Sequence, residues 1–359
     1  MRAAVLHAIG DTKLEVRDDV GVVDVGPGTV RVKIHATGVC HSDLSAMRGI
    51  LPQAAPAVLG HEGAGEVLEV GEGVTHVAPG DHVIICWVPP CGTCNYCIGG
   101  QANLCMVGMM DSFTNPRFTF GDTQAFGMAG TGTFAEELVV LGTAAQKIPD
   151  DVPYEIASLI GCGVTTGVGA VINTAKVVPG SSVVVFGAGG VGISVIQGAR
   201  VAGAAEIVAV DLNPGKLEAT KKFGASHVAT PDDLPALSAE LTGGEGFDYA
   251  FEVVGRADVI RSAYDNTRRG GTCVVVGAGS AEDMVSFSAL ELFAMEKKIL
   301  GTIYGSSDVR RDYNRLIRLW KTGRLDLEGM ISRRIGLDDV NDAFAALSDG
   351  DVIRQVISF

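Results

Sequence analysis

The spacing of hydrophobic and polar positions changes along the chain and divides it into three parts. From residue 1 to about residue 170, short apolar runs alternate with glycine and proline, as in VRVKIHATG, HVIICWV and FAEELVV. Runs of this length and composition are typical of strands. The first part is therefore predicted to be an irregular, β-rich unit.

Strand-like and helical patterns alternate in the second part. VVVF precedes a glycine turn and the helical VGISVIQGARVAGA, IVAVD precedes NPGKLEATKKF, and FDYAFEVV precedes a helical stretch and TCVVVG. This alternation is typical of a doubly wound parallel sheet. The third part returns to a strand, KILGTIYG, two helical stretches and a last strand, VIRQVISF.

Composition and charge narrow the class of protein. The chain has 359 residues, of which 47% are hydrophobic and 19% charged, so about two folded domains are expected. A net charge of −14 would repel a phosphate backbone, which argues against nucleic acid as a partner. The N-terminus lacks a signal-peptide pattern and no apolar run approaches ~18 residues, so we expect a cytoplasmic protein without a membrane span.

Four of the eight cysteines lie in CGTCNYCIGGQANLC, at Cys91, Cys94, Cys97 and Cys105. Disulfide frameworks belong to small secreted chains, and a redox site needs only two cysteines. Four thiolates with this spacing can surround Zn²⁺ tetrahedrally. The segment therefore predicts a structural zinc site, which is coordinatively closed and leaves no position for a substrate.

A glycine-rich turn, GAGGVG, follows the strand SVVVF and opens a helix. Its residues are Gly187, Ala188, Gly189, Gly190, Val191 and Gly192. In this context the pattern predicts a dinucleotide site, with the pyrophosphate at the helix N-terminus. Because Asn213 and Pro214 already suit the start of the next helix, Asp211 is expected to be free to bind a ribose hydroxyl, which favours NAD over NADP.

Cysteine, histidine and carboxylates also cluster in two turns of the β-rich part. One runs from Cys40 to Asp43, and the other contains His61 and Glu62. These groups suit an open catalytic zinc site. Spacing alone leaves the third ligand open, and the candidates are Cys86, Cys162 and Cys273.

In combination these motifs resemble the zinc-dependent medium-chain alcohol dehydrogenases over essentially the whole chain. The shared motifs are GHE-x2-G-x5-G-x2-V from Gly60, the four-cysteine loop, GCGVTTG from Gly161, GAGGVG and VIRQVISF. The resemblance implies a GroES-like catalytic domain at residues 1–163 and 304–359. A Rossmann domain at residues 164–303 would be inserted within it.

The resemblance also implies roles for individual residues. It places Cys40, His61 and Cys162 on a catalytic zinc, with Asp43 orienting the histidine and Glu62 behind the metal. It makes Ser42 the hydroxyl that takes the alcohol's proton and puts Trp87 and Leu51 at the substrate. On the cofactor side it assigns Lys216 to a ribose and His41 and Arg354 to the pyrophosphate.

Some positions depart from the family pattern. Ser45 stands where many members carry a proton-relay histidine, so either Ser45 and water carry the proton out or the relay is shorter. Met109 and Leu51 stand where glutathione-dependent formaldehyde dehydrogenases carry an arginine and an acid. Residues 106–133 are rich in Met, Phe and Gly and contain few charges, which suggests a surface loop or an apolar lid.

The sequence therefore predicts an NAD-dependent enzyme with two zinc ions per chain that interconverts an apolar alcohol with its aldehyde or ketone. Formaldehyde with glutathione, or a polyol, is the alternative substrate, although polyol enzymes usually replace the third cysteine ligand with a carboxylate. A catalytically silent NAD-binding relative is the alternative from another class. The resemblance implies a homodimer or homotetramer, and the only other partner expected is the small-molecule substrate.

Overall fold

The structure is a computed structural model that describes residues 1–350 and 352–359. Contacts divide the chain into two units. The β-rich unit comprises residues 1–163, 308–322 and 327–359, and the α/β unit comprises residues 164–307 and 323–326. The predicted return to the first domain, at residue 304, lies close to the point where the chain leaves the α/β unit.

The described residues of the β-rich unit form thirteen strands in two sheets. Its strands are β1 (Ala3–Leu6), β2 (Glu15–Arg17), β3 (Val20–Val22), β4 (Thr29–Val39), β5 (Ala57–Val58), β6 (Gly63–Val70), β7 (His82–Ile85), β8 (Phe118–Phe120), β9 (Thr123–Gly127), β10 (Glu137–Leu141), β11 (Ala145–Lys147), β18 (Ile331–Ile335) and β19 (Arg354–Ser358). Its helices are α1 (His41–Met47), α2 (Asn95–Ile98), α3 (Met106–Thr114), α4 (Tyr154–Leu159), α11 (Val309–Lys321) and α12 (Val340–Asp349).

The larger sheet pairs the early strand β4 with β19, the last strand of the chain. Its order is β11-β7-β6-β4-β19-β18, with β10 also paired to β4. On β4, Val30, Val32 and Ile34 are buried in the core, while the residues between them are more exposed, as expected for a sheet with one covered face. The C-terminal strand β19 pairs antiparallel with β4, with Gln355 opposite Val39. Arg354 therefore lies close to the segment that begins at Cys40.

The α/β unit is a six-stranded parallel sheet. Its strands are β12 (Ser182–Phe186), β13 (Glu206–Val210), β14 (His227–Ala229), β15 (Phe247–Glu252), β16 (Thr267–Val275) and β17 (Lys298–Gly301). Its helices are α5 (Thr165–Gly169), α6 (Gly190–Ala202), α7 (Pro214–Phe223), α8 (Leu234–Thr242), α9 (Ala257–Asp265) and α10 (Ala289–Met295).

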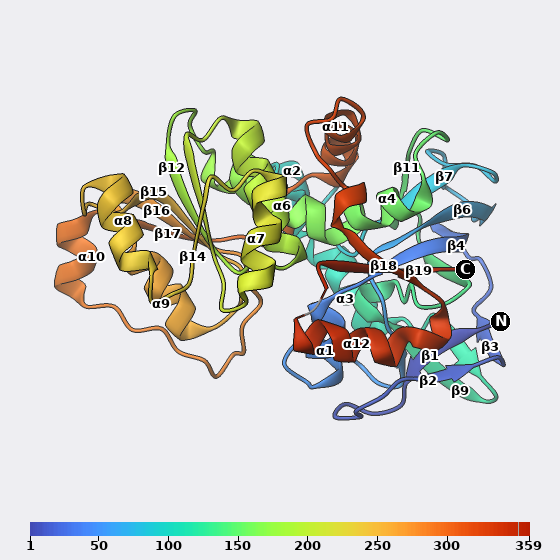
Figure 1. Cartoon of the computed structure of the whole chain (residues 1–359). Helices are drawn as coiled ribbons and strands as arrows, with labels where there is room; N and C mark the ends of the chain where they lie inside the picture. The colour runs from blue at the N-terminus through green and yellow to red at the C-terminus, as the bar shows by residue number, and fades with distance from the viewer. Residues whose placement is uncertain (351) are drawn as a thin grey trace. The chain divides into compact units, whose positions relative to one another are not determined.

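The strand order β14-β13-β12-β15-β16-β17 confirms the predicted doubly wound topology. Figure 1 shows α6 and α7 on one side of this sheet and α8 and α9 on the other. The order reverses between β12 and β15, and the glycine turn follows β12 at this point. In doubly wound sheets such a switch point is where a dinucleotide binds.

Residues 106–133 are not a simple surface loop. They form α3, the hairpin of β8 and β9, and a short 3₁₀ turn. The loop interpretation is wrong because β9 pairs with β5 and so joins the smaller sheet, whose order is β2-β1-β5-β9-β8-β3. Four large apolar side chains of α3 are exposed, namely Met106, Val107, Met110 and Phe113.

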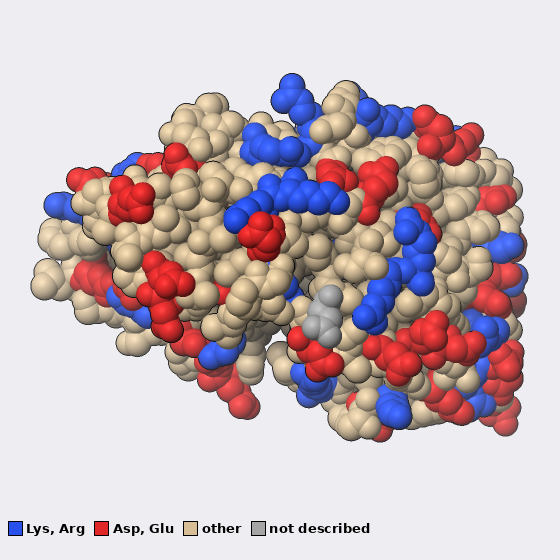
Figure 2. All heavy atoms as spheres, viewed as in Figure 1, with Lys and Arg blue, Asp and Glu red and all other residues tan. Residues whose placement is uncertain are grey.

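One helical stretch, Tyr154–Ala175, is long and apolar enough to cross a membrane by length and composition. Of its most apolar window, 83% is buried within the protein, as in the core helix of a folded domain. Acidic and basic groups intermingle on the face drawn in Figure 2.

The glycine turn yields a paired prediction. A β-carbon on Gly192 would overlap the carbonyl oxygen of Gly187, whereas one on Gly189 would have no atom within 4 Å. We expect Gly192→Ala to destabilise the protein by on the order of 3 kcal/mol through overpacking. We expect Gly189→Ala to change stability by under about 0.5 kcal/mol.

Gly189→Ala should nevertheless weaken NADH binding by about tenfold or more, because its methyl group would occupy the space that the pyrophosphate approaches. Thermal unfolding and NADH fluorescence titration measure the two effects. Unchanged NADH affinity in Gly189→Ala would contradict a pyrophosphate site at this turn.

Candidate zinc and cofactor sites

The four-cysteine loop forms a compact sulfur cluster. The Sγ atoms of Cys91, Cys94, Cys97 and Cys105 all lie within 4.8 Å of one another. The Cys91–Cys97 and Cys94–Cys105 pairs are each 4.0 Å apart, near the ~3.8 Å edge of a tetrahedron with ~2.3 Å zinc–sulfur bonds. A disulfide needs about 2.05 Å between sulfurs, so these pairs are not disulfides.

Backbone amides support thiolates in this loop. The N–H groups of Thr93 and Cys94 donate to the Sγ of Cys91 at 3.4 and 3.3 Å. The bond from Thr93 contributes most to lowering the pKa of the Cys91 thiol to about 6. Burial instead raises the pKa of Cys97 to about 12. Since zinc binds thiolates, the cluster suits a metal that supplies the charge needed to deprotonate all four.

A second cluster contains Cys40, His61 and Glu62, whose potential ligand atoms lie within 4.8 Å of one another. Cys40 is the N-cap of α1, directly after β4. His61 and Glu62 precede β6. All three side chains are buried.

Cys162 joins this cluster from a distant part of the chain. It lies in a π-helical turn, Ile160–Val164, that continues from α4. A hydrogen bond with Cys162 is the largest of the influences that lower the pKa of the Cys40 thiol well below its usual value. Of the other two candidates, Cys86 bonds to the carbonyl of Val88, and Cys273 is buried in the core of the α/β unit.

One carboxylate ties the two ligand-bearing segments together. Asp43 is fully buried, and its Oδ2 accepts the N–H of Cys40 at 2.9 Å. Its Oδ1 accepts the N–H of Gly60 at 3.2 Å and lies 3.1 Å from the Nδ1 of His61. The bond to Nδ1 orients the imidazole and directs its Nε2 toward the other ligands.

The residues present suit a zinc ion. The Nε2 of His61 is buried and has no hydrogen-bond partner among the described residues. Burial alone would lower the pKa of His61, but the Asp43 carboxylate and the Cys40 thiol outweigh it and raise the pKa to about 10. Without a metal the site thus retains a proton on this ring, and a bound cation would replace the proton's charge.

Glu62, a member of this cluster, also forms a buried ion pair with Arg354. The resemblance assigned Arg354 to the pyrophosphate, but its side chain is only 5% exposed and pairs with Glu62, so its role toward the cofactor stays a prediction. A β-carbon on Gly38 would collide with the Glu62 carboxylate. Sequence reasoning missed Gly38, whose only signal is a glycine inside a strand.

Two other predicted residues of the β-rich unit, Ser42 and Trp87, lie next to Cys40 and His61. Ser42 Oγ lies 3.7 Å from the Sγ of Cys40. The Trp87 ring meets the His61 ring edge-on, with centroids 6.3 Å apart. Leu51 is half-buried and follows α1, while His41 is exposed at the first position of that helix.

The α/β unit places Asp211 beside the glycine turn. Asn213 and Pro214 begin α7 as expected, because the Asn213 side chain accepts the N–H of Gly215 and Lys216. Asp211 is not free, however: its oxygens accept the N–H of Ala188 at 2.8 Å and of Asn213 at 2.9 Å. Each carboxylate oxygen can accept a second bond, so Asp211 keeps acceptor capacity for a ribose hydroxyl.

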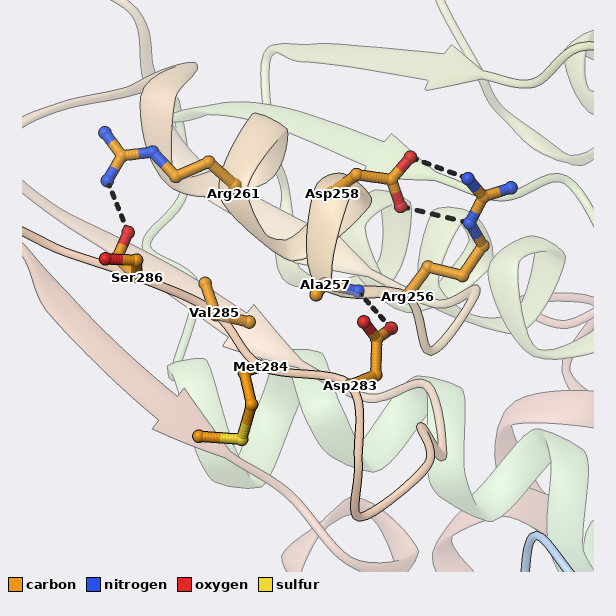
Figure 3. A pocket seen from close by; sticks show the side chains of 8 residues that line it. All are labelled: Arg256, Ala257, Asp258, Arg261, Asp283, Met284, Val285 and Ser286. Atoms are coloured by element: carbon orange, nitrogen blue, oxygen red, sulfur yellow. Dashed lines mark hydrogen bonds and ion pairs between the residues drawn. The ribbon is translucent and has the colours of Figure 1, made fainter.

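A separate hollow of about 560 Å³ lies at the start of α9 (Figure 3). Arg256 pairs there with Asp258, and Asp283 accepts the N–H of Ala257. None of the predicted site residues lines this hollow. The other lining cation, Arg261, pairs with Asp265 and Glu291, which do not line the hollow.

The proton on His61 gives a pH prediction. Below about pH 10, zinc must displace this proton from His61. We therefore expect the zinc affinity of the site that contains His61 to rise about tenfold per pH unit between about pH 7 and 9. The zinc ion that Cys40→Ala fails to bind identifies this site. Asp43→Asn removes the carboxylate that raises the pKa and should flatten this dependence. Competition with a chromophoric chelator measures the affinity.

Asp248→Asn is the matched control, because Asp248 also accepts a backbone N–H but lies in the α/β unit. Parallel pH dependences in the wild type and Asp43→Asn would contradict the predicted link between His61 and Asp43.

Comparison with known proteins identifies the family. A model of the alcohol dehydrogenase GroES-like domain matches residues 26–150, and a model of the zinc-binding dehydrogenase matches residues 190–322. An S-(hydroxymethyl)glutathione dehydrogenase from Synechocystis is 40% identical over 374 aligned residues, covering 100% of this chain and 99% of that protein.

Solved structures agree with these matches. The benzyl alcohol dehydrogenase of Acinetobacter calcoaceticus superposes with a TM-score of 0.92 at 32% identity, covering 100% of this chain and 99% of that one. A zinc-binding dehydrogenase of Sinorhizobium meliloti bound to NADP has a TM-score of 0.82 at 25% identity, covering 100% and 99%. The chain therefore belongs to the zinc-dependent medium-chain alcohol dehydrogenases.

Proposed function

We propose that this dehydrogenase interconverts apolar alcohols, medium-chain or aromatic and primary or secondary, with their aldehydes or ketones, using NAD. The observation that carries the proposal is the buried cluster of Cys40, His61 and Cys162, in which the Nε2 of His61 has no partner among the described residues. Two thiolates and one imidazole leave a tetrahedral metal with one open position, as catalysis requires.

The residues around this cluster supply binding, orientation and proton transfer. Zinc held by these three ligands would act as a Lewis acid on the alcohol oxygen, while the nicotinamide accepts the hydride. Asp43 holds the proton of the imidazole on Nδ1 and so keeps Nε2 available as a ligand. We assign to Ser42 the role of taking the proton of the alcohol, and the 3.7 Å between its Oγ and the Sγ of Cys40 supports this role.

Asp211 supports NAD over NADP. Its carboxylate is anchored beside the glycine turn by two backbone N–H groups. A negative charge there favours a ribose hydroxyl and repels a 2′-phosphate. The half-buried Lys216, in the first turn of α7, is proposed to contact the same ribose.

Apolar side chains support an apolar substrate. Trp87 lies against the ring of His61, and Leu51 stands just beyond α1. No charged group occupies positions 51, 87 or 109, where the chain has Leu, Trp and Met. An aromatic wall beside an apolar side chain favours an uncharged alcohol.

S-(hydroxymethyl)glutathione is a second candidate substrate, because curated relatives at 40% and 39% identity carry that name. Glutathione has two carboxylates, which would require cationic partners in the substrate site. Met109 replaces the arginine expected there. A polyol is disfavoured by Cys162, and a silent relative by the intact ligand set.

We also propose a homodimer in the cytoplasm. Strand β17 is the last strand of its sheet, and the neighbouring α10 exposes Leu290 and Phe293 at 73% and 84%. An unpaired edge beside exposed apolar side chains favours pairing with a second copy. None of the eight cysteines, all of which lie among the described residues, forms a disulfide, which agrees with a reducing compartment.

Removal of one ligand tests the catalytic metal. Cys40→Ala and Cys162→Ala should each reduce the zinc content from two to one per chain and abolish turnover, while NADH binding is retained. Cys273→Ala is the control, since it removes a buried thiol of the α/β unit and should keep both zinc ions. Substantial turnover by a variant with one zinc would overturn the proposal.

A substrate panel tests the specificity. We expect benzyl-type, terpenoid and longer alkyl alcohols to have kcat/KM at least about 100-fold above sorbitol and above formaldehyde with glutathione. Initial rates of NAD⁺ reduction provide the measurement, with ethanol as the small-alcohol reference. Activity confined to formaldehyde with glutathione would establish the second candidate instead.

A further inference from the structure

The turn that carries Cys162 receives a hydrogen bond from a distant helix. The hydroxyl of Tyr313 donates to the carbonyl oxygen of Gly161 at 3.3 Å, across 152 positions of sequence. Tyr313 is 1% exposed, and both residues belong to the β-rich unit. Gly161 immediately precedes Cys162 in the π-helical turn, and π-helical turns are frequent at functional sites.

The first turn of α11 holds Tyr313 in place. The helix buries one face, formed by Val309, Asp312, Tyr313, Leu316 and Ile317. At its start, Asp308 accepts the N–H of Arg310. The buried Asp312 accepts the N–H of Asp308 and pairs with the guanidinium of Arg311. The phenol is therefore directed by a helix whose N-terminus is fixed.

The bonded carbonyl and the N–H of Cys162 belong to the same peptide group, which is planar. A hydrogen bond to that carbonyl restricts rotation of the plane about its two flanking dihedral angles. One of these angles is the φ of Cys162, which sets the direction of its Cα–Cβ bond. The Tyr313 hydroxyl thus acts on the direction in which the Cys162 sulfur points.

The glycines that flank Cys162 show how the turn is packed. A β-carbon on Gly161 would lie 3.5 Å from the Cα of Glu62 and from the carbonyl of Ile85. One on Gly163 would lie 3.4 Å from the guanidinium carbon of Arg354. Even with an added methyl group, the glycines on both sides of Cys162 would make only ordinary van der Waals contacts. Packing at these two positions therefore leaves room for the peptide to rotate, and the hydrogen bond from Tyr313 is a directional contact that opposes such rotation.

We propose that Tyr313 is a positioning residue that orients Cys162 toward the metal formed with Cys40 and His61. The inference rests on the proposed function, because it takes Cys162 as a zinc ligand. Outer groups that orient ligands typically change metal affinity or activity by roughly 10- to 100-fold when they are removed.

The test compares two variants that each remove one buried hydroxyl. Tyr313→Phe removes the bond to Gly161, whereas Tyr264→Phe removes a buried hydroxyl that has no hydrogen-bond partner among the described residues and lies in the α/β unit. Cobalt(II) is substituted for zinc at the site formed by Cys40, His61 and Cys162. Subtracting the spectrum of Cys162→Ala isolates the thiolate-to-cobalt band of this site. Stopped-flow release of zinc to a chelator gives the rate of metal loss.

We expect Tyr313→Phe to shift this band and to release zinc roughly 10- to 100-fold faster than the wild type, with thermal stability similar to that of Tyr264→Phe. Tyr264→Phe should match the wild type in band and release rate. If the two variants behave alike, the inference is overturned while the zinc site stands. If Cys162→Ala leaves the cobalt spectrum of the wild type unchanged, the ligand assignment and this inference both fall.

Discussion

The buried carboxylate of Asp43 is the contact on which the arrangement of the catalytic cluster depends. It bonds to the N–H of Cys40, the N–H of Gly60 and the ring of His61, and so joins two segments that β4 and β6 deliver separately. A fully buried carboxylate without such partners would be costly, so the three contacts specify one arrangement of these segments. A metal ion would add the positive charge that balances the thiolates and this carboxylate.

The third ligand depends on contacts of longer range. Cys162 is brought to Cys40 by a turn that packs on Glu62 and Ile85 and accepts a hydrogen bond from Tyr313. Strand β19 pairs with β4 and brings Arg354 to Glu62. The proposed ligands all come from the first half of the chain, while Tyr313 and Arg354, which support them, come from its last fifty residues.

The four-cysteine loop differs from the catalytic cluster because its metal ligands are close together in the sequence. Its sulfurs come from fifteen consecutive residues, and its backbone amides bond to those same sulfurs. Such a site needs little from the remainder of the fold. Its chemistry is correspondingly closed, while the open site is assembled from segments that the fold must hold in register.

The sequence alone was sufficient for features whose physics is local. The spacing of the four cysteines, the glycine turn after a strand and the alternation of strands and helices predicted the sulfur cluster and the doubly wound sheet, because neighbouring residues generate each of them. Family resemblance supplied the ligand set that spacing left open. Only the tertiary structure placed Arg354 against Glu62, satisfied Asp211 with backbone N–H groups and brought Tyr313 to Gly161. These contacts join residues far apart in the chain, and no local periodicity encodes which distant partner a buried polar group will meet.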